Sequence, residues 1–261
     1  MPGSTPAGYL LDLDGTLYSG DAAVPGAAET IARLRARGAP LRFVTNTTSS
    51  SRRTIGLRLA RYGLVVSPEE IVTATRAGVA VVREAGYQQV TPFVPAGALE
   101  DMEELPLVGG TSERPWAAAD VVVVGDLGEA WTFALLQEAF DQLMAGAALV
   151  ALSRDRYFRR GDRLALDAGP FVAALEYASN SAATVAGKPS AAFFAAAVGS
   201  LGLAPGQMVA MVGDDLWSDV QGAQRAGLQG WLVRTGKFRE DALAASGIIP
   251  DRILASVADL S

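Results

Sequence analysis

The chain has 261 residues, of which 50% are apolar, and its 28 acidic and 22 basic residues give a formal net charge of −6. It contains neither Cys nor His, which excludes disulfides, thiolate or imidazole metal ligands, cysteine nucleophiles and Ser-His-Asp catalysis. The acidic balance argues against a nucleic-acid partner, because nucleic-acid-binding surfaces need a basic excess. Any catalysis must therefore use carboxylates, hydroxyls, amides, Lys, Arg or Tyr, and carboxylate oxygens favour Mg²⁺, Ca²⁺ or Mn²⁺.

The N-terminal third predicts strands that alternate with helices. The expected elements are strand 9–12, helix 27–37, strand 41–45 and helix 52–62. In the second helix Ile55 and Leu59, four residues apart, define one apolar face. Ser67 before Pro68 predicts the start of a further helix, since Ser is a good N-cap and Pro suits the first helical position. This alternation indicates a parallel sheet with helices on both faces.

The rest of the chain continues the alternation. In the middle we expect strands at 90–94, 120–125 and 148–152, helices at 97–105, 131–145 and 171–178, and a loop over the basic stretch 154–163. The last third predicts helix 190–201, strand 208–212, helix 220–226 and strand 230–233. The fold class is therefore α/β: a Rossmann-like parallel-sheet core from residues 1–77 and 181–261, with an inserted α/β domain, 78–180. We expect Trp131 and Phe133 in the core of the inserted domain.

The sequence gives no sign of a membrane partner. No stretch approaches the roughly 18 apolar residues of a membrane-spanning helix. The first residues also lack the basic segment followed by an apolar one that marks a signal peptide. We therefore expect a cytoplasmic protein.

The segment Asp12-Leu13-Asp14-Gly15 carries the most chemical information. Residues i and i+2 of an extended strand point the same way, so both acids can serve one site. Two crowded carboxylates are costly unless a cation lies between them or one keeps a proton, which suits a hard-metal site with a nucleophilic carboxylate beside an acid. An ordinary strand-ending turn is the alternative. A calcium loop is excluded, because it needs Asp or Asn and then Gly where this chain has Thr16 and Leu17.

Further polar residues follow two other predicted strands, at the edge where ligands of open α/β sheets gather. Thr45 and Asn46 precede a helix, so they can cap it or, with its free N–H groups, bind an anion. Asp214, Asp215 and Asp219 follow a fully apolar strand. We favour metal binding for Asp214, whereas helix capping and metal support are equally open for Asp219.

Lys188 is unusual because the cationic residues of this chain are almost all Arg. Of the 22 basic residues, only Lys188 and Lys237 are Lys. Lys188 also lies immediately before a helix opened by Pro189 and Ser190. We interpret it as an active-site cation that neutralises charge on a phosphate and restrains the paired acids.

In this order, these segments resemble the haloacid dehalogenase superfamily of Mg²⁺-dependent aspartyl phosphatases. The stretch 12–16 is similar to its first motif, Thr45 to its second, Lys188 to its third and 213–219 to its fourth. The resemblance covers nearly the whole chain. Only 33 positions separate Asp12 from Thr45, whereas 143 separate Thr45 from Lys188, so the inserted domain is similar to the cap of the type IIA (NagD-like) branch.

Longer segments look closest to two subgroups of that branch. These are the phospholysine phosphohistidine inorganic pyrophosphate phosphatases and their hydrolase-domain-containing relatives. The segments are 43–48, 169–177, 185–189 and 234–238. The stretch 166–170 leans toward the first subgroup.

The resemblance implies an Mg²⁺-dependent phosphatase for a small phosphorylated substrate: a phosphate ester, a phosphoramidate or pyrophosphate. Asp12 would attack phosphorus and become an aspartyl phosphate, while Asp14 would protonate the leaving oxygen and then deprotonate the hydrolytic water. Mg²⁺ would be held by Asp12, the backbone carbonyl of Asp14, and Asp214, with Asp215 and Asp219 in support. The phosphoryl oxygens would be held by Thr45, Asn46 and Lys188.

Other functions of the superfamily stay open. Asp14 argues against a dehalogenase or a phosphonate hydrolase, but a phosphomutase shares both acids, and a non-catalytic phosphate-sensing or interaction protein is a second alternative. The cap would set substrate choice, with four candidate residues facing the site: Arg154, Tyr157, Asp167 and Phe171. An apolar face of the cap could form a homodimer with its symmetry mate.

Overall fold

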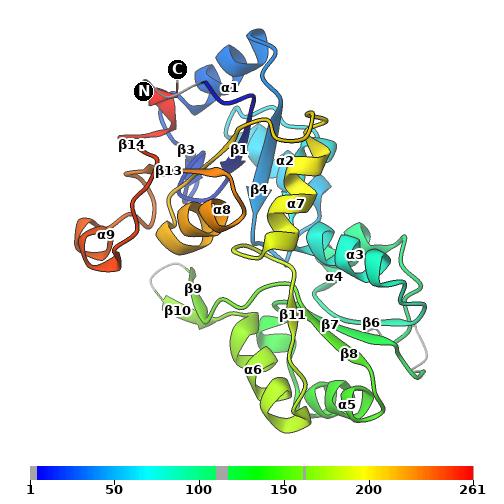
Figure 1. The fold of residues 1–261 in the computed structure, drawn as a ribbon. Coiled ribbons are helices and arrows are strands. Elements are labelled where there is room, and N and C mark those ends of the chain that lie inside the picture. The colour runs from blue at the N-terminus through cyan, green and yellow to red at the C-terminus, as the bar shows by residue number, and fades with distance from the viewer. Residues whose placement is uncertain (1–4, 110–116, 161–162, 261) are drawn as a thin grey trace. The chain divides into compact units, whose positions relative to one another are not determined.

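The computed structural model describes residues 5–109, 117–160 and 163–260, which contacts divide into two compact units (Figure 1). The core unit comprises Met1–Thr45, Arg52–Val72 and Lys188–Ser261. The inserted unit comprises Asn46–Ser51 and Thr73–Gly187. The domain limits 78–180, which are narrower, stay a proposal.

The core unit is built on a six-stranded sheet, which confirms the predicted α/β class. Its spatial order is β14 (Arg252–Leu254), β13 (Gln229–Val233), β12 (Val209–Gly213), β1 (Gly8–Asp12), β4 (Leu41–Thr45) and β5 (Ile71–Thr73). The pairings from β14 to β4 are parallel, and Leu11 of β1 lies opposite Val212 and Phe43. Strands such as β12 are buried along their whole length, as expected where helices cover both faces of a parallel sheet.

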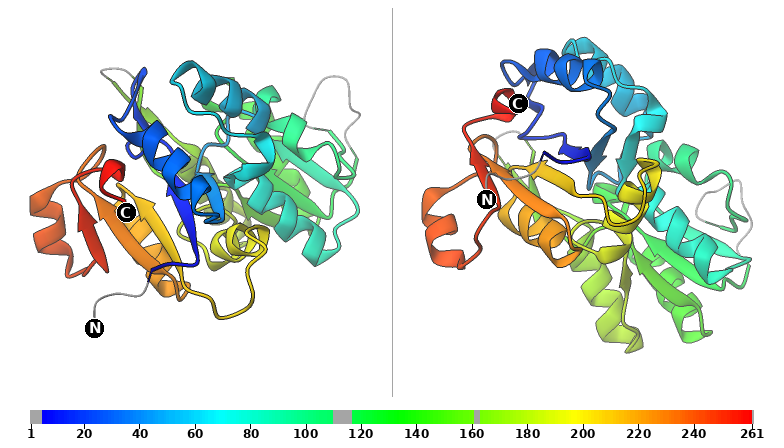
Figure 2. Two further views of the ribbon diagram at one scale, coloured as in Figure 1. Left: turned by 90° about the horizontal axis from the view of Figure 1, so that it is seen from above. Right: turned by 45° about the horizontal axis from the view of Figure 1, so that its top comes forward.

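Helices form a layer on each face of the core sheet. Side chains of α1 (Ala27–Ala36) and α2 (Arg52–Arg61) share one apolar cluster with Tyr9 and Leu11 of β1. On the opposite side of the sheet lie α7 (Ala191–Ser200) and α8 (Gly222–Arg225), as Figure 2 shows. Smaller elements complete the unit: β2 (Tyr18–Ser19), β3 (Ala22–Ala23), α9 (Glu240–Ser246), the π-helical stretch Leu216–Gln221 and the 3₁₀ turns Pro68–Glu70 and Val257–Asp259.

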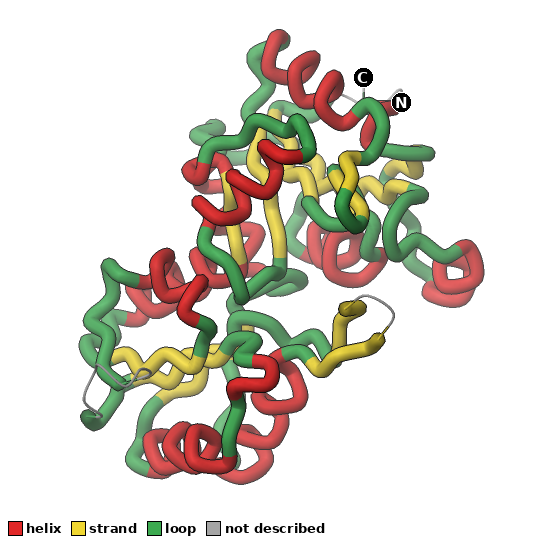
Figure 3. The backbone as a smooth tube through the Cα atoms, turned by 180° about the vertical axis from the view of Figure 1, so that it is seen from behind, coloured by secondary structure: helices red, strands yellow, loops and turns green. Residues whose placement is uncertain are grey.

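The inserted unit has its own parallel sheet. Its spatial order is β11 (Thr184–Val185), β8 (Ala148–Ala151), β7 (Val121–Val124) and β6 (Val90–Phe93). The helices α5 (Phe133–Met144) and α6 (Ala168–Ser179) pack on one face through an apolar cluster, and α3 (Ala74–Ala85) lies on the other face (Figure 3). Short helical elements complete the unit: α4 (Ala96–Leu99) and the 3₁₀ turns Glu100–Met102 and Gly128–Ala130.

Several sequence-based expectations differ from the structure. The loop expected at 154–163 was wrong, because β9 (Tyr157–Arg160) and β10 (Arg163–Leu166) form an antiparallel hairpin there. The helix expected after Ser67 is a single 3₁₀ turn, because the apolar residues from Ile71 continue directly as β5. The helix expected at 220–226 begins earlier, as the π-helical stretch.

Two further differences concern the inserted unit. Phe133, expected in its core, is 80% exposed at the first residue of α5. Helix α3 was not predicted, although Thr73 caps it and Gly86 ends it in the left-handed conformation. Across the three described ranges, no helix is both long and apolar enough to cross a membrane.

Candidate active site

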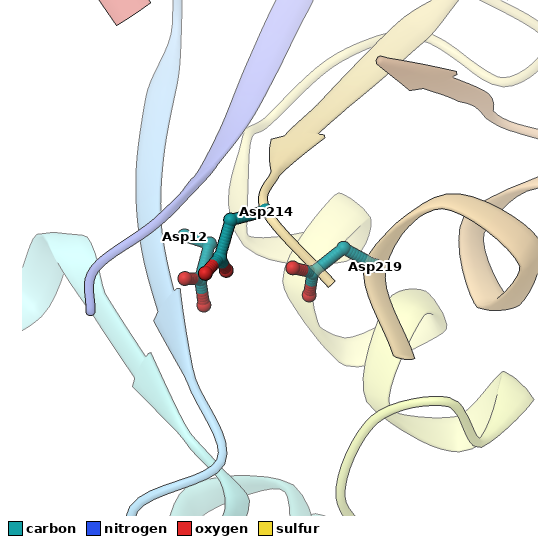
Figure 4. A group of neighbouring side chains, drawn as sticks. All are labelled: Asp12, Asp214 and Asp219. Carbon is teal, nitrogen blue, oxygen red and sulfur yellow. The ribbon is translucent and has the colours of Figure 1, made fainter. Parts of the chain in front are cut away.

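Three carboxylates converge at the carboxyl ends of two neighbouring strands of the core sheet (Figure 4). Asp12 is the last residue of β1, Asp214 directly follows the adjacent strand β12, and Asp219 lies in the π-helical stretch that comes next. Each residue offers an oxygen within 4.8 Å of the others, and the three are only 6%, 3% and 1% exposed. Buried carboxylates this close require a compensating positive charge or protons.

Lys188 supplies part of that positive charge. Its Nζ donates to Asp12 Oδ1 at 2.5 Å and to Asp219 Oδ1 at 2.7 Å, and the residue is 4% exposed. Burial on its own would lower the pKa of this ammonium, but the two carboxylates outweigh burial and raise the pKa above its ordinary value. Lys188 therefore stays charged, and it ties β1 to the π-helical stretch.

Asp219 and Asp215 use their carboxylates to fix the local backbone. Asp219 Oδ2 accepts from the Asp215 N–H at 3.1 Å, while its Oδ1 holds Lys188. Asp215 Oδ1 accepts from the N–H groups of Trp217 and Ser218, each at 3.0 Å, and thereby caps the π-helical stretch. Burial tends to raise the pKa of Asp215, but Lys237 and these N–H groups lower it overall. Asp215 and Asp219 therefore fix the backbone of the π-helical stretch, and Asp219 also holds the ammonium of Lys188.

Three glycines lie directly against the carboxylates of Asp214 and Asp219. A Cβ added to Gly15 or to Gly236 would lie closer than 3.0 Å to Asp214 Oδ2, and one added to Gly213 would meet Asp219 in the same way. Gly15 and Gly236 also have positive φ values, 85° and 59°, that side chains rarely adopt. The Lys237 N–H, next in the chain, donates to Asp214 Oδ2 at 2.6 Å. Two loops distant in sequence thus close directly on one carboxylate.

The three grouped carboxyl groups, those of Asp12, Asp214 and Asp219, have raised pKa values. Burial, then the charges of Asp12 and Asp219, raise the pKa of Asp214 to about 8. Burial also raises the pKa of Asp219 to about 7 against the pull of Lys188, and it raises that of Asp12 against the same pull. A group of oxygen ligands with this excess of negative charge fits a hard divalent cation.

Asp14 lies apart from the group of three carboxylates. Its side chain is exposed, and its backbone pairs with Tyr18 in an isolated β-bridge. Desolvation by neighbouring atoms raises the pKa of its carboxyl group, against the charges of Lys237 and Arg58 and a hydrogen bond from the Gly15 N–H. The proposed metal contact through the Asp14 carbonyl stays a prediction, whereas Asp219, expected only in support, lies within the group.

The proposed phosphate ligands are divided between the two units. Thr45 is buried at the end of β4, next to β1, and Lys188 belongs to the core unit. Asn46 belongs by its contacts to the inserted unit, where its Nδ2 donates to Asp155 Oδ2 at 3.3 Å. The proposed role of Asn46 therefore rests on its place in the chain directly after Thr45.

Three of the four proposed specificity residues have structural partners within the inserted unit. Arg154 pairs with Glu176 at 2.6 Å, and Asp167 caps α6 by accepting from the Ala168 N–H at 2.6 Å. Phe171 stacks on Trp131, with ring centroids 5.1 Å apart. Tyr157 is exposed on β9. Among the four, Tyr157 is therefore the side chain with the most surface to offer a ligand.

The segment 234–238, which follows β13, was singled out from sequence only for its resemblance to the two subgroups, and it was given no role at the site. Gly236 and Lys237 contact Asp214 there, and Thr235 Oγ1 donates to the Gly15 carbonyl at 2.5 Å. The position of this loop after a predicted strand, and the scarcity of Lys, were usable signals. The contacts themselves depend on the pairing of β12 with β13, which the sequence does not specify.

Family models and relatives match this chain over most of its length. A haloacid dehalogenase-like hydrolase model matches residues 9–107, and a HAD-hydrolase-like model matches residues 185–260. Haloacid dehalogenase-like hydrolase domain-containing protein 2 of Bos taurus is 44% identical over 230 residues, which cover 88% of this chain and 85% of that protein. Phospholysine phosphohistidine inorganic pyrophosphate phosphatase of Homo sapiens is 35% identical over 238 residues, which cover 89% and 84%.

Solved structures share the fold. The p-nitrophenyl phosphatase from Archaeoglobus fulgidus has a TM-score of 0.87 at 28% identity and covers 98% of both chains. NagD from E. coli K-12 has a TM-score of 0.86 at 24% identity and covers 99% of both. The glycerol phosphate phosphatase Rv1692 from Mycobacterium tuberculosis, in complex with calcium, has a TM-score of 0.83 at 27% identity and covers 98% of this chain and 74% of that one. This chain therefore belongs to the haloacid dehalogenase-like hydrolases, as a phosphatase of the NagD-like branch with a cap domain.

Proposed function

We propose that this chain is an Mg²⁺-dependent phosphatase that hydrolyses a small phosphate ester, phosphoramidate or pyrophosphate through an aspartyl-phosphate intermediate. The observation that supports it is the buried group of Asp12, Asp214 and Asp219 with Lys188 at the carboxyl ends of β1 and β12. Asp12 and Asp214, with the Asp14 carbonyl, would hold the cation. When bound, Mg²⁺ would neutralise charge on the phosphoryl oxygens.

The remaining chemistry is assigned to side chains of this chain. A carboxylate oxygen of Asp12 attacks phosphorus, and Asp14 gives its proton to the leaving oxygen. Asp14 then takes a proton from the water that hydrolyses the aspartyl phosphate, which restores both residues. The ammonium of Lys188, the Thr45 hydroxyl and the Asn46 amide stabilise the phosphoryl oxygens. The raised pKa of Asp14 supports its role as the proton donor.

Hydrolysis of p-nitrophenyl phosphate tests this assignment. We expect turnover that requires Mg²⁺, stops with a chelator and falls by about 10⁴-fold or more in Asp12→Asn, because the nucleophile is lost. Asp21→Asn is a matched control, since Asp21 is an exposed acid in the turn between β2 and β3. Intact activity in Asp12→Asn would refute the nucleophile assignment. Binding of phosphorylated compounds without turnover would instead favour a phosphate sensor.

We also propose that the chain forms a homodimer through its inserted unit. We propose a cytoplasmic location as well. A surface cavity of about 220 Å³ between α5 and α6 is lined by apolar side chains that include Phe133, Phe140 and Leu175. Phe133, at 80% exposure, is costly to leave in water. Light scattering should give the mass of a dimer for the native chain and of a monomer for Phe133→Glu. A monomeric native chain would rule the dimer out.

A further inference from the structure

The backbone around Asp14 fixes a neighbouring tyrosine. Asp14 and Tyr18 form an isolated β-bridge, and the Gly15 N–H donates to the Tyr18 carbonyl at 2.7 Å. Tyr18 then opens the short β2–β3 hairpin by pairing with Ala23. Main-chain contacts therefore hold Tyr18 beside the proposed proton donor.

Helix α2 holds the side chain of that tyrosine. The rings of Tyr18 and Tyr62 lie 5.4 Å apart between centroids. Burial, then the charge of Asp14, raise the pKa of the Tyr18 hydroxyl, and the guanidinium of Arg58 acts against both. Arg58 lies in the last turn of α2, and Tyr62 directly follows the end of that helix. Tyr62 also donates from its hydroxyl to the Gly20 carbonyl at 3.4 Å. The end of α2 therefore packs against Tyr18, which is bridged to Asp14.

The guanidinium of Arg58 is exposed and can bind a ligand. Desolvation raises the pKa of the Asp14 carboxyl group, and the charges of Lys237 and Arg58 act against it. Lys237 is already paired with Asp215 at 3.2 Å. Arg58 is exposed, and within the described part of the chain no carboxylate lies within salt-bridge distance of it. Helix α2 contains four Arg and no acidic residue, so its own turns offer no partner either.

We propose that Arg58, positioned by Tyr18 and Tyr62, is a specificity residue that binds an anionic group on the leaving part of the substrate. This inference rests on the proposed function, because a leaving oxygen that Asp14 protonates must come within hydrogen-bonding reach of Asp14. The rest of the leaving group would then lie near the exposed guanidinium of Arg58. A phosphate or carboxylate fits the planar fork of Arg, which makes two parallel hydrogen bonds to such groups. The favoured substrates are therefore pyrophosphate or phosphorylated hydroxy acids.

A matched pair of substrates tests the inference. 3-Phosphoglycerate and glycerol 3-phosphate differ in a carboxylate against a neutral hydroxymethyl group, and pyrophosphate provides a phosphate in the same role. We expect the native protein to favour the anionic leaving groups. In Arg58→Gln, the ratio of kcat/KM for 3-phosphoglycerate over glycerol 3-phosphate should fall about 10- to 100-fold, mainly through KM, because a charge-assisted contact is lost.

Three further variants separate recognition from structure. Arg58→Lys should recover part of the ratio, since it keeps the charge but not the fork. Tyr18→Phe should lower the ratio less than Arg58→Gln, because it only loosens the positioning of Arg58. Arg61→Gln removes the same charge one turn further along α2. It should leave the ratio within about twofold of the native value, because the interaction of an exposed charge with a substrate is weak.

Two results would overturn the inference. One is a native protein with no preference for anionic leaving groups, and the other is an equal loss for both substrates in Arg58→Gln. A native protein that turns over p-nitrophenyl phosphate but shows either result would leave the proposed phosphatase function intact. Absence of turnover on every ester would refute that function, and this inference with it.

Discussion

The two units use the same architecture and differ in what they bury at the carboxyl ends of their strands. Both have a parallel sheet with helices on either face. At those ends the core unit buries three carboxylates and the ammonium of Lys188. In the inserted unit, the carboxylates that follow β7 and β8, Asp126 and Asp155, are only half-buried. Burying charge is costly and the architecture does not require it, so the charges of the core unit mark a functional site.

Removal of the buried cation should have the largest effect. Lys188→Met leaves Asp12 and Asp219 without their shared partner, so at pH 8 we expect a loss of about 3–5 kcal/mol in the free energy of unfolding. Phosphatase activity should fall at least about 10²-fold as well. Urea denaturation and p-nitrophenyl phosphate kinetics measure the two effects.

An exposed pair in the inserted unit gives the contrast for that variant. Arg154→Met breaks the ion pair with Glu176, in which Arg154 is half exposed, and should cost less than about 1 kcal/mol. Equal losses in Lys188→Met and Arg154→Met would mean that burial does not distinguish the two regions. Adding Asp219→Asn to Lys188→Met should recover part of the lost stability, because it removes one of the unpaired charges.

Closing the space beside Asp214 should affect activity more than stability. Gly236→Ala places a methyl group closer than 3.0 Å to Asp214 Oδ2 and to the Gly15 Cα, so the carboxylate must move. We expect kcat/KM to fall about 10²-fold, since small misplacements of a reacting group have effects of that size. Gly247→Ala is the matched control. Gly247 also has positive φ, 68°, but nothing lies within 4 Å of its added Cβ, so only the conformational cost of about 1 kcal/mol should appear.

The smallest expected effect is a dependence of stability on pH. Folding raises the pKa of Asp214 from its ordinary value of 3.8 to about 8, mainly through burial. Between these values Asp214 binds more protons in the folded than in the unfolded protein, so its contribution to stability is highest below about pH 4 and is lost as the pH rises toward 8. With a chelator present, the melting temperature should therefore fall by a few degrees from pH 5.5 to pH 8.5.

Two comparisons attribute this slope to the site. Asp214→Asn should flatten it, because the amide does not titrate, whereas an unchanged slope would place its origin elsewhere. Mg²⁺ should reduce the slope in the native protein, since ligation favours the deprotonated carboxylates at high pH.

Regular elements with strong periodicity were predictable from sequence. β4 has the predicted limits, 41–45, because Pro40 and Asn46 bracket an apolar run. The residues now grouped at the core site were also named from sequence, because each follows a strand or precedes a helix. The hairpin β9–β10 was missed because Arg residues interrupt its short strands, and because the leucines of β10, Leu164 and Leu166, are exposed rather than part of a buried face.

Contacts between distant segments were not predictable. The sharing of Lys188 by Asp12 and Asp219 depends on how β1, β12 and the π-helical stretch pack, and no local pattern encodes that packing. The contacts of Gly15 and Gly236 with Asp214 were not predictable either, because from sequence both glycines look like ordinary turn residues. Propensity describes neighbours along the chain, while a site is made by neighbours in space.

The balance of charge in the buried group has one more consequence. Three carboxylates against one ammonium leave two negative charges, and the acids offset them by keeping protons up to near-neutral pH. Loading a dication would then be an exchange, with protons expelled as the ion enters. The heat of loading measured by calorimetry should therefore vary with the ionisation enthalpy of the buffer, and the apparent affinity should rise as the solution becomes more alkaline.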